Sequence, residues 1–459
     1  MNDNKGNPAV LAAVMATALI TTFMGNALNL SIPEIESTFH VNAATVNAVM
    51  SAYTITVAAL SLPFGKIADS RGRRKVFLTG ITGFGLMSVL NAFSVNFLMF
   101  IIVRVLQGMF AAMMFTTNNA ILISSYPPSQ RGKVLGLSVA ATYIGLTLGP
   151  VVGGFLQSSF GWRSIFAVSA MIALAALIIA IKGVPVDERA KQSLTEGSDA
   201  AGPILYPLSI ILTLLGLTYL TAAKLSPVIL LAGLVLLVLF FKLEQKTSNP
   251  VLRTSLFTGS RTFTFSNLAA LLNYGSTYAI TYMMSIYLQL VKGFAPDKAG
   301  LILISMPLMQ ALFSPLMGSL SDRVRPAILA SGGMGLCAAS LLMLSRVSQD
   351  TPLAYIMVPL LLTGLGFGMF SSPNNNLIMS CVEPKDYSVA NSIIATMRTC
   401  GQATGLAVLN IITGALLGKS TLESAGAERI VALDRTSFLI FSAICIAGLF
   451  FSLARDKRS

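Results

Sequence analysis

Long apolar runs separated by short polar connections occupy most of the 459-residue chain. A helix needs about 20 apolar residues to cross the hydrocarbon core of a bilayer, and the runs reach that length. The pattern predicts an all-α polytopic membrane protein with fourteen spanning helices. A polar break at 224–227 keeps the seventh and eighth runs apart. The expected spans are 8–31, 45–64, 75–95, 97–120, 133–157, 164–182, 203–223, 226–242, 262–290, 299–319, 326–346, 353–373, 388–417 and 435–454.

Composition supports this interpretation. Hydrophobic residues make up 54% of the chain and charged residues 11%, with a mean hydropathy of +0.76. Soluble domains carry about 25% charged residues, so a soluble or disordered chain is excluded. Four cysteines without a CxxC pair disfavour a disulfide framework or a zinc site, and the single histidine, His40, removes most histidine chemistry. We expect no cofactor and no metal.

The net charge of +13 reflects membrane topology, because the basic residues lie in short loops between apolar runs. With both termini in the cytoplasm, 21 Lys and Arg residues fall inside and 8 outside, and Arg104 and Arg398 remain within spans. This predicts a multi-pass protein of the cytoplasmic membrane and disfavours nucleic acid as a partner. The first apolar run is too long for a signal peptide, so no cleavable leader is expected.

An internal repeat divides the chain. A shift of 256 residues places Gly108 on Gly364 and Gly145 on Gly401, and it also pairs Asn118–Asn119, Ser124, Pro128 and Gly149 with like residues. Duplicated halves that flank a midplane site are typical of secondary transporters. The seventh and eighth spans are then an insertion. The predicted divisions are a six-helix bundle at 1–183, a cytoplasmic linker at 184–202, two inserted helices at 203–245 and a second six-helix bundle at 246–459.

The loop G-K-I-A-D-S-R-G-R-R-K at 65–75 resembles the cytoplasmic loop signature of the major facilitator superfamily. The resemblance implies that this loop latches the cytoplasmic gate. Asp69 is expected to face the positive N-terminus of the helix that starts near Ser388, and the arginines to meet the membrane surface. The alternative is that these charges only enforce topology. The expected gating residues are Gly65, Asp69, Arg71, Gly72, Arg73 and Arg74.

Two further stretches resemble superfamily signatures. R-V-L-Q-G at 104–108 is similar to the buried-arginine motif, although Arg104 could instead snorkel to the headgroups. G-L-T-L-G-P-V-V-G-G at 145–154 resembles the signature of the antiporter branches, which implies efflux. Its small residues allow close helix approach and its proline bends the backbone. The residues of this second stretch are Gly145, Gly149, Pro150, Gly153 and Gly154.

Over nearly its whole length the chain resembles the fourteen-helix drug:proton antiporter family, but it departs from that family's pattern in the first span. Met24 stands where the family carries an aspartate, whereas Asn29 and Pro33 match. All eighteen acidic residues, Asp434 included, are assigned to connections or helix ends. Glu34 and Glu36 are the nearest candidates for a displaced proton site, with Arg104 and Arg398 as further coupling candidates; coupling to another ion or to none stays open.

The predicted function is export of amphipathic small molecules by alternating access, driven by protons in one version, in a monomer embedded in the lipid bilayer. Without a midplane carboxylate, neutral, zwitterionic or anionic substrates are favoured. The alternatives are a specific exporter or flippase of a lipid or anionic metabolite, and a non-transporting receptor. An enzyme is disfavoured because no catalytic set occurs within the spans. Family resemblance and the repeat give the expected cavity lining as Asn26, Asn29, Arg104, Gln107, Asn273, Tyr274, Tyr278, Tyr282 and Phe370. The tyrosines could equally pack between helices.

Overall fold

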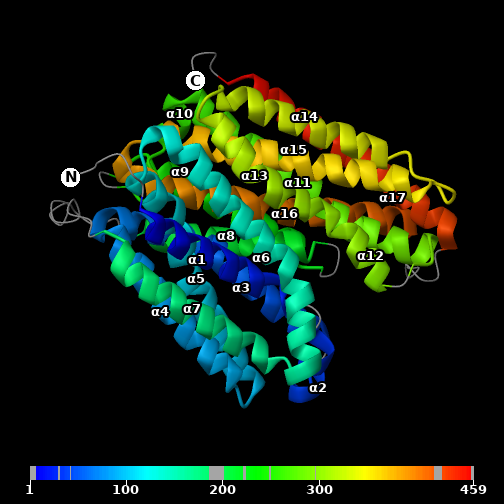
Figure 1. The fold of residues 1–459 in the computed structure, drawn as a ribbon, viewed down its shortest axis with the longest axis horizontal. Coiled ribbons are helices and arrows are strands. Elements are labelled where there is room, and N and C mark those ends of the chain that lie inside the picture. Colours follow the sequence, from blue (N-terminus) through cyan, green and yellow to red (C-terminus); the bar gives the residue numbers. More distant parts are fainter. Residues whose placement is uncertain are drawn as a thin grey trace. The chain divides into compact units, whose positions relative to one another are not determined.

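The computed structural model describes residues 7–28, 31–41, 43–185, 201–220, 224–247, 250–294, 296–417 and 426–455. These residues form helices and connections only, as Figure 1 shows. The expected all-α fold is therefore confirmed. The helices up to the inserted pair are α1 Pro8–Asn26, α2 Ile32–Phe39, α3 Ala43–Arg71, α4 Arg73–Ala92, α5 Phe97–Ser125, η2 Pro128–Gln130, α6 Arg131–Phe160, α7 Arg163–Gly183, α8 Gly202–Thr218 and α9 Ser226–Glu244.

The remaining elements complete the described part of the chain. They are α10 Ser255–Gly259, α11 Arg261–Ile286, η4 Tyr287–Val291, α12 Pro296–Leu303, α13 Ser305–Ser321, α14 Pro326–Leu344, α15 Leu353–Ser380, η5 Pro384–Asp386, α16 Tyr387–Leu417 and α17 Gly426–Leu453. The segment η4 is a π-helical continuation of α11. In hydrocarbon each backbone N–H and C=O must be satisfied within the segment, which is why these apolar runs form helices.

Eleven stretches among the described residues are long and apolar enough to cross a membrane. Of the other expected spans, α8 is a shorter apolar helix, and the long helices α3 and α11 are not among these eleven stretches. The break between α8 and α9 is confirmed, because α8 ends at Thr218 and α9 begins at Ser226. The boundaries of the first expected span were wrong: α1 ends at Asn26 and the separate helix α2 begins at Ile32.

The chain folds into two compact units. The first comprises Met1–Ile211, Leu236–Thr254 and Val382–Thr396, and the second comprises Leu212–Val235, Ser255–Cys381 and Met397–Ser459. In the first unit α1 packs against α6 and α4 lies beside α7; in the second, α14 packs against both α15 and α17 (Figure 1). Of the expected linker 184–202, residues 186–200 lie outside the described part of the chain.

Paired glycines show that the two units repeat the same packing. A side chain on Gly108 of α5 would meet the Tyr53 carbonyl of α3, and one on Gly364 of α15 would meet the Met306 carbonyl of α13. These two glycines are aligned by the 256-residue shift. The short 3-10 turns η2 and η5, each opening on a proline, also precede α6 and α16 in the same way, although both turns belong to the first unit. The internal repeat inferred from sequence is therefore also a repeat of helix contacts.

Candidate functional site: a polar seam at the start of helix α16

The loop between α3 and α4 places a carboxylate against the first turn of α16. Asp69 lies in the last turn of α3, and Gly72, with φ of 103°, turns the chain into α4. The Asp69 carboxylate accepts hydrogen bonds from the Ser388 N–H at 3.0 Å and the Val389 N–H at 3.1 Å. The first N–H groups of a helix have no intrahelical partner and carry partial positive charge, so an anion caps them well. The expected contact between Asp69 and this helix is confirmed.

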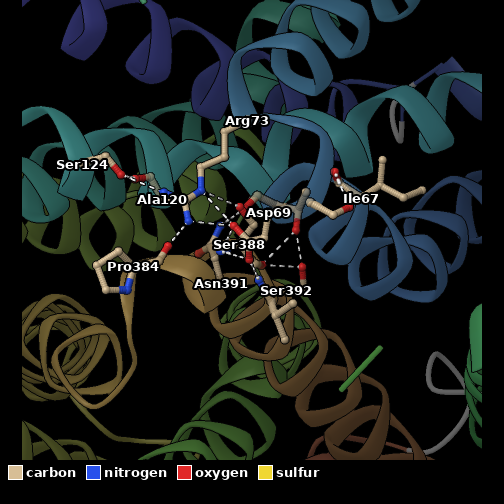
Figure 2. Close-up of polar contacts among 12 residues, drawn as sticks. Ile67, Asp69, Arg73, Ala120, Ser124, Pro384, Ser388, Asn391 and Ser392 are labelled. Atoms are coloured by element: carbon tan, nitrogen blue, oxygen red, sulfur yellow. Dashed lines mark hydrogen bonds and ion pairs between the residues drawn. The ribbon is translucent and has the colours of Figure 1, made fainter. Parts of the chain in front are cut away.

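Arg73 joins the same contact from the start of α4. Its guanidinium pairs with Asp69 at 2.8 Å, donates to the Ser124 hydroxyl of α5 at 2.9 Å, and donates to the Pro384 carbonyl of η5 (Figure 2). The Tyr387 ring lies 5.4 Å from it. Arg73 is only 8% exposed. The expectation that it meets the membrane surface was therefore wrong, because a charge pattern read along one loop does not reveal that α16 covers it.

A row of small polar side chains extends this contact along α16. The Ser392 hydroxyl donates to the Ser61 carbonyl of α3 at 2.8 Å and bonds to the Thr116 hydroxyl of α5. The Asn391 amide donates to the Phe115 carbonyl at 2.6 Å and accepts from Asn119 at 2.7 Å. We call the contacts of residues 384–392 with α3, α4 and α5 the α16 seam. Sequence reasoning missed the seam partners on α5, although Asn119 and Ser124 stood out in the repeat.

Gly65 sets how closely α3 and α16 approach. A methyl group at this position would lie 2.5 Å from the Ser392 hydroxyl and 2.9 Å from the Ser388 carbonyl. Both distances are shorter than any normal carbon contact, so a side chain would force the two helices apart. The glycine of the loop signature is therefore required by packing in this conformation.

The electrostatics of the seam are finely balanced. Burial raises the pKa of Asp69 to about 6, although Arg73 and the hydrogen bonds from Ser388 and Val389 oppose this shift. Burial also lowers the pKa of Lys66, and the Arg253 guanidinium lowers it further. Arg253 in turn pairs with Asp386 of η5 at 3.5 Å. The pKa of the carboxylate at the centre of the seam therefore lies close to neutral pH, so a modest change of pH alters its charge.

The other loop arginines are placed differently from Arg73. Arg71 is exposed, in agreement with a role at the surface. Arg74 donates to the Ile181 carbonyl at the end of α7 at 2.9 Å. It therefore ties α4 to α7 within the first unit.

Arg104 is enclosed in the first unit. It is 0% exposed, donates to the Gln107 side chain at 2.8 Å, and lies under the Tyr53 ring at 4.5 Å. Gln107 in turn donates a hydrogen bond to the Ser88 hydroxyl of α4 at 2.8 Å. Stacking on an aromatic face offsets part of the cost of burying a guanidinium. Arg104 and Gln107, both expected to line a cavity, lie inside the helix packing in this conformation.

The second unit holds the other expected lining residues. Asn273 and Phe370 are fully buried, and the Tyr274 ring packs edge to face against Phe367 with ring centroids 5.2 Å apart. Tyr278 and Tyr282, on the same face of α11, are about half exposed. The three tyrosines therefore do not share one environment. Asn29 lies outside the described residues, and the side chain of Asn26 at the end of α1 is not described.

The glycine-rich stretch of α6 packs against α1. A side chain on Gly145 would meet the Leu19 carbonyl, and one on Gly153 would meet the Ala27 carbonyl. The Thr22 hydroxyl donates across the same contact to the Thr142 carbonyl at 3.0 Å. Gly149, Pro150 and Gly154 lie on the same helix. Small residues here bring two backbones together, as expected from the sequence.

Comparison with known proteins settles the family. The model of the Major Facilitator Superfamily matches residues 14–262 and 267–459. The chain belongs to this superfamily. It is therefore a multi-pass membrane transporter and not an enzyme. The fold is similar to that of the human organic anion transporter MFSD10, with a TM-score of 0.69, 14% identity and coverage of 97% of this chain and 99% of that one.

Relatives within the superfamily carry several transport names. The chain is 29% identical to the riboflavin transporter RibZ of Clostridioides difficile, over 98% of both chains. It is 28% identical to the puromycin resistance protein pur8 of Streptomyces alboniger, over 88% of this chain and 82% of that one. The methylenomycin A resistance protein of Bacillus subtilis is 28% identical over 91% of this chain and 89% of the relative.

The ionisable groups considered for coupling in this transporter lie in three places. Glu34 is in the short helix α2, with one carboxylate oxygen buried and unpaired among the described contacts. Arg398 lies in α16 and is half-buried. Asp434 was expected outside the spans, but it is fully buried in the third turn of α17. That expectation was wrong because α17 begins at Gly426, well before the expected start at 435. The side chain of Glu36 is not described.

Proposed function

We propose that the chain is a fourteen-helix secondary active exporter of amphipathic small molecules, driven by protons and working by alternating access in the cytoplasmic membrane. Both termini would lie in the cytoplasm and the transporter would act as a monomer. The α16 seam is the observation that carries this proposal. It joins the start of one long helix to three others through a single carboxylate cap, an arginine and small hydroxyls.

The seam has the properties of a latch that opens and closes. Its bonds are polar, and each is worth about 0.5–1.5 kcal/mol net, because water replaces the lost partner when the contact opens. A hydrophobic contact of the same extent would expose apolar surface instead. The parts that bring α3 and α16 together, Gly65 and the capped N–H groups of Ser388 and Val389, involve no bulky side chain.

Export is favoured by the relatives and by the α6 glycines. Proteins named for resistance to puromycin and to methylenomycin A are 28% identical to this chain over most of their length. The α6 stretch resembles the signature of antiporter branches. A specific observation favours a second candidate, transport of riboflavin: the similarity to the riboflavin transporter covers 98% of both chains.

Substrate charge is expected to be neutral or negative. Arg398 contributes a positive charge in the middle part of α16, and it is not fully buried. Arg104 is enclosed in this conformation and would reach a substrate only after the packing around Tyr53 changes. A lipophilic cation therefore has less to pair with than an anion.

Proteoliposomes would decide between these functions. The purified protein is reconstituted, and uptake of radiolabelled puromycin and of riboflavin into inside-out oriented vesicles is measured with an imposed pH gradient. The proposal expects gradient-dependent transport of puromycin that Asp69→Asn slows without changing the amount of reconstituted protein. Transport of riboflavin alone would establish the second candidate instead. Transport of neither, together with unchanged drug susceptibility of cells that express the protein, would refute both.

A further inference from the structure

In the described part of the second unit, one acidic side chain is fully buried without a hydrogen-bond partner. Asp434 lies in the third turn of α17 and is 0% exposed. Neither carboxylate oxygen has a hydrogen-bond partner in the described part of the chain. The Ser437 hydroxyl, one turn further along the same face of α17, is also buried and unpartnered there. Charged groups inside membrane helices are costly and mark ion or proton pathways more often than structural contacts.

Among the described residues, the elements packed most extensively on α17 are α14, α11 and η4, and no ion pair joins the carboxylate to any of them. Helix α14 has no charged residue, and the only charged residue of α11 is Arg261, at the end of that helix remote from η4. Lys292, just after η4, donates to the Gln349 carbonyl, and Arg435 donates to the Val347 carbonyl at 2.6 Å. An ionised carboxylate without a partner is strongly unfavourable in such surroundings, so Asp434 should hold a proton in this conformation.

The element that faces Asp434 is distorted. Tyr287 opens the π-helical segment η4, is fully buried, and interacts electrostatically with both Asp434 and Asp350. Its hydroxyl donates to the Ser348 carbonyl at 2.6 Å. Asp350 is exposed. Single π-helical turns inside α-helices are frequent at functional sites. Tyr287 therefore lies within electrostatic range of the buried carboxyl and of an acid at the surface of the unit.

We propose that Asp434 binds and releases the proton that drives transport. On uptake, a proton from water bonds to one carboxylate oxygen. On release, that O–H bond breaks and the proton returns to water, with no transfer of electrons. Release requires water or a cation to reach the carboxylate, which the packing of α17 on η4 prevents in the described conformation. This inference rests on the proposed proton-driven function.

Infrared difference spectroscopy on the purified full-length protein in nanodiscs tests the site without any substrate. Spectra are recorded between two pH values, with and without ¹³C-labelled aspartate. We expect a carboxylic acid C=O band that titrates, shifts with the label and is absent from Asp434→Asn. Glu428→Gln is the matched control, because it removes an exposed acid from the first turn of the same helix. A label-sensitive band that remains in Asp434→Asn, or no titrating band, would overturn the proposal. If Asp434→Asn does not fold, Asp434→Glu replaces it, and the titrating band of this variant must no longer shift with ¹³C-labelled aspartate.

Transport measurements separate this proposal from the proposed function. Asp434→Asn should lose pH-gradient-driven accumulation of puromycin while it retains exchange of labelled for unlabelled puromycin, since exchange needs no net proton movement. Glu428→Gln should behave as wild type in both. Accumulation by Asp434→Asn at the wild-type level would overturn the role of Asp434 and leave export intact. If the wild type moves neither puromycin nor riboflavin, the proposed function fails, and the infrared band still decides whether Asp434 is a titrating site.

Discussion

A single methyl group at Gly65 should open the α16 seam. Gly65→Ala would place its Cβ 2.5 Å from the Ser392 hydroxyl and 2.9 Å from the Ser388 carbonyl. The hydroxyl could rotate away, but it is held by the Ser61 and Ser388 carbonyls, each at 2.8 Å. The Ser388 carbonyl is backbone and can move only with α16. Relief therefore requires α16 to shift by several tenths of an ångström.

The cost of this shift sets the size of the effect. Overpacking of this kind costs about 1–3 kcal/mol, and each weakened hydrogen bond adds about 0.5–1.5 kcal/mol. With one hydrogen bond weakened, the closed seam loses about 1.5–4.5 kcal/mol, which is roughly a 12- to 1,600-fold change in the equilibrium between closed and open. The methyl group does not strain the open state, so the whole free-energy cost destabilises the closed state.

Amide hydrogen exchange measures this equilibrium directly. The N–H groups of Ser388 and Val389 exchange only when the Asp69 cap opens, so their exchange should speed up by the same factor in nanodiscs. Gly25→Ala is the matched control, because its methyl group would meet nothing within 4 Å in the same unit. If both variants exchange at the wild-type rate at these two amides, α3 and α16 do not constrain one another and the latch argument is refuted.

Three further predictions follow from buried contacts. The pKa of Asp69 is about 6 in the closed seam and should approach about 3.9 when water reaches it, so protonation favours closure. Lowering the pH from 7.5 to 5 should therefore reduce the open population about tenfold, measured as amide hydrogen exchange corrected for the intrinsic exchange rate. Asp69→Asn should abolish this dependence on pH. Arg104→Lys should lower the unfolding temperature, since an ammonium cannot stack flat on Tyr53 while it bonds to its neighbour, whereas Arg346→Lys at an exposed site should not. Gly145→Leu should destabilise the contact of α6 with α1 by more than about 1–3 kcal/mol in thermal unfolding, since the backbone carbonyl of Leu19 stands in the way together with the Thr22 hydroxyl. An unchanged transition in either variant would contradict the packing described.

Hydropathy predicted the helices, because backbone groups within a bilayer must be hydrogen-bonded within the segment. The repeat predicted which helices of the two halves correspond. The contact of Asp69 with Ser388 was also predictable, since a helix N-terminus attracts an anion wherever the chain brings the two together. These features depend on local sequence or on its periodicity. Predicting these features does not require knowing which side chains bury one another in the folded protein.

What the sequence could not predict depends on partners far away in the chain. From the sequence Arg73 is expected at the surface, but η5 and α16 cover it in the structure. Arg104 is expected to line a cavity, but Tyr53 stacks on it. Charged residues near Asp434 lower the local hydropathy, so the expected span begins only after it. In the structure, the packing of η4 and α14 on α17 buries this residue. A span edge drawn from hydropathy has an error of several residues, which is enough to move a carboxylate from outside to inside.

Helix α16 connects the two proposals. Its first residues form the seam, and further along Gly401 and Gly405 bring it against the backbone of α11 at Leu271 and Gly275. Backbone contacts of this kind leave no side chain to absorb a displacement, so α11 and α16 must move together. The other end of α11 continues into η4, where Tyr287 faces Asp434. On this proposal, a proton gained or lost at Asp434 would change the packing of α17 on η4. Gly401 and Gly405 would then pass a movement of α11 to the part of α16 that belongs to the same unit.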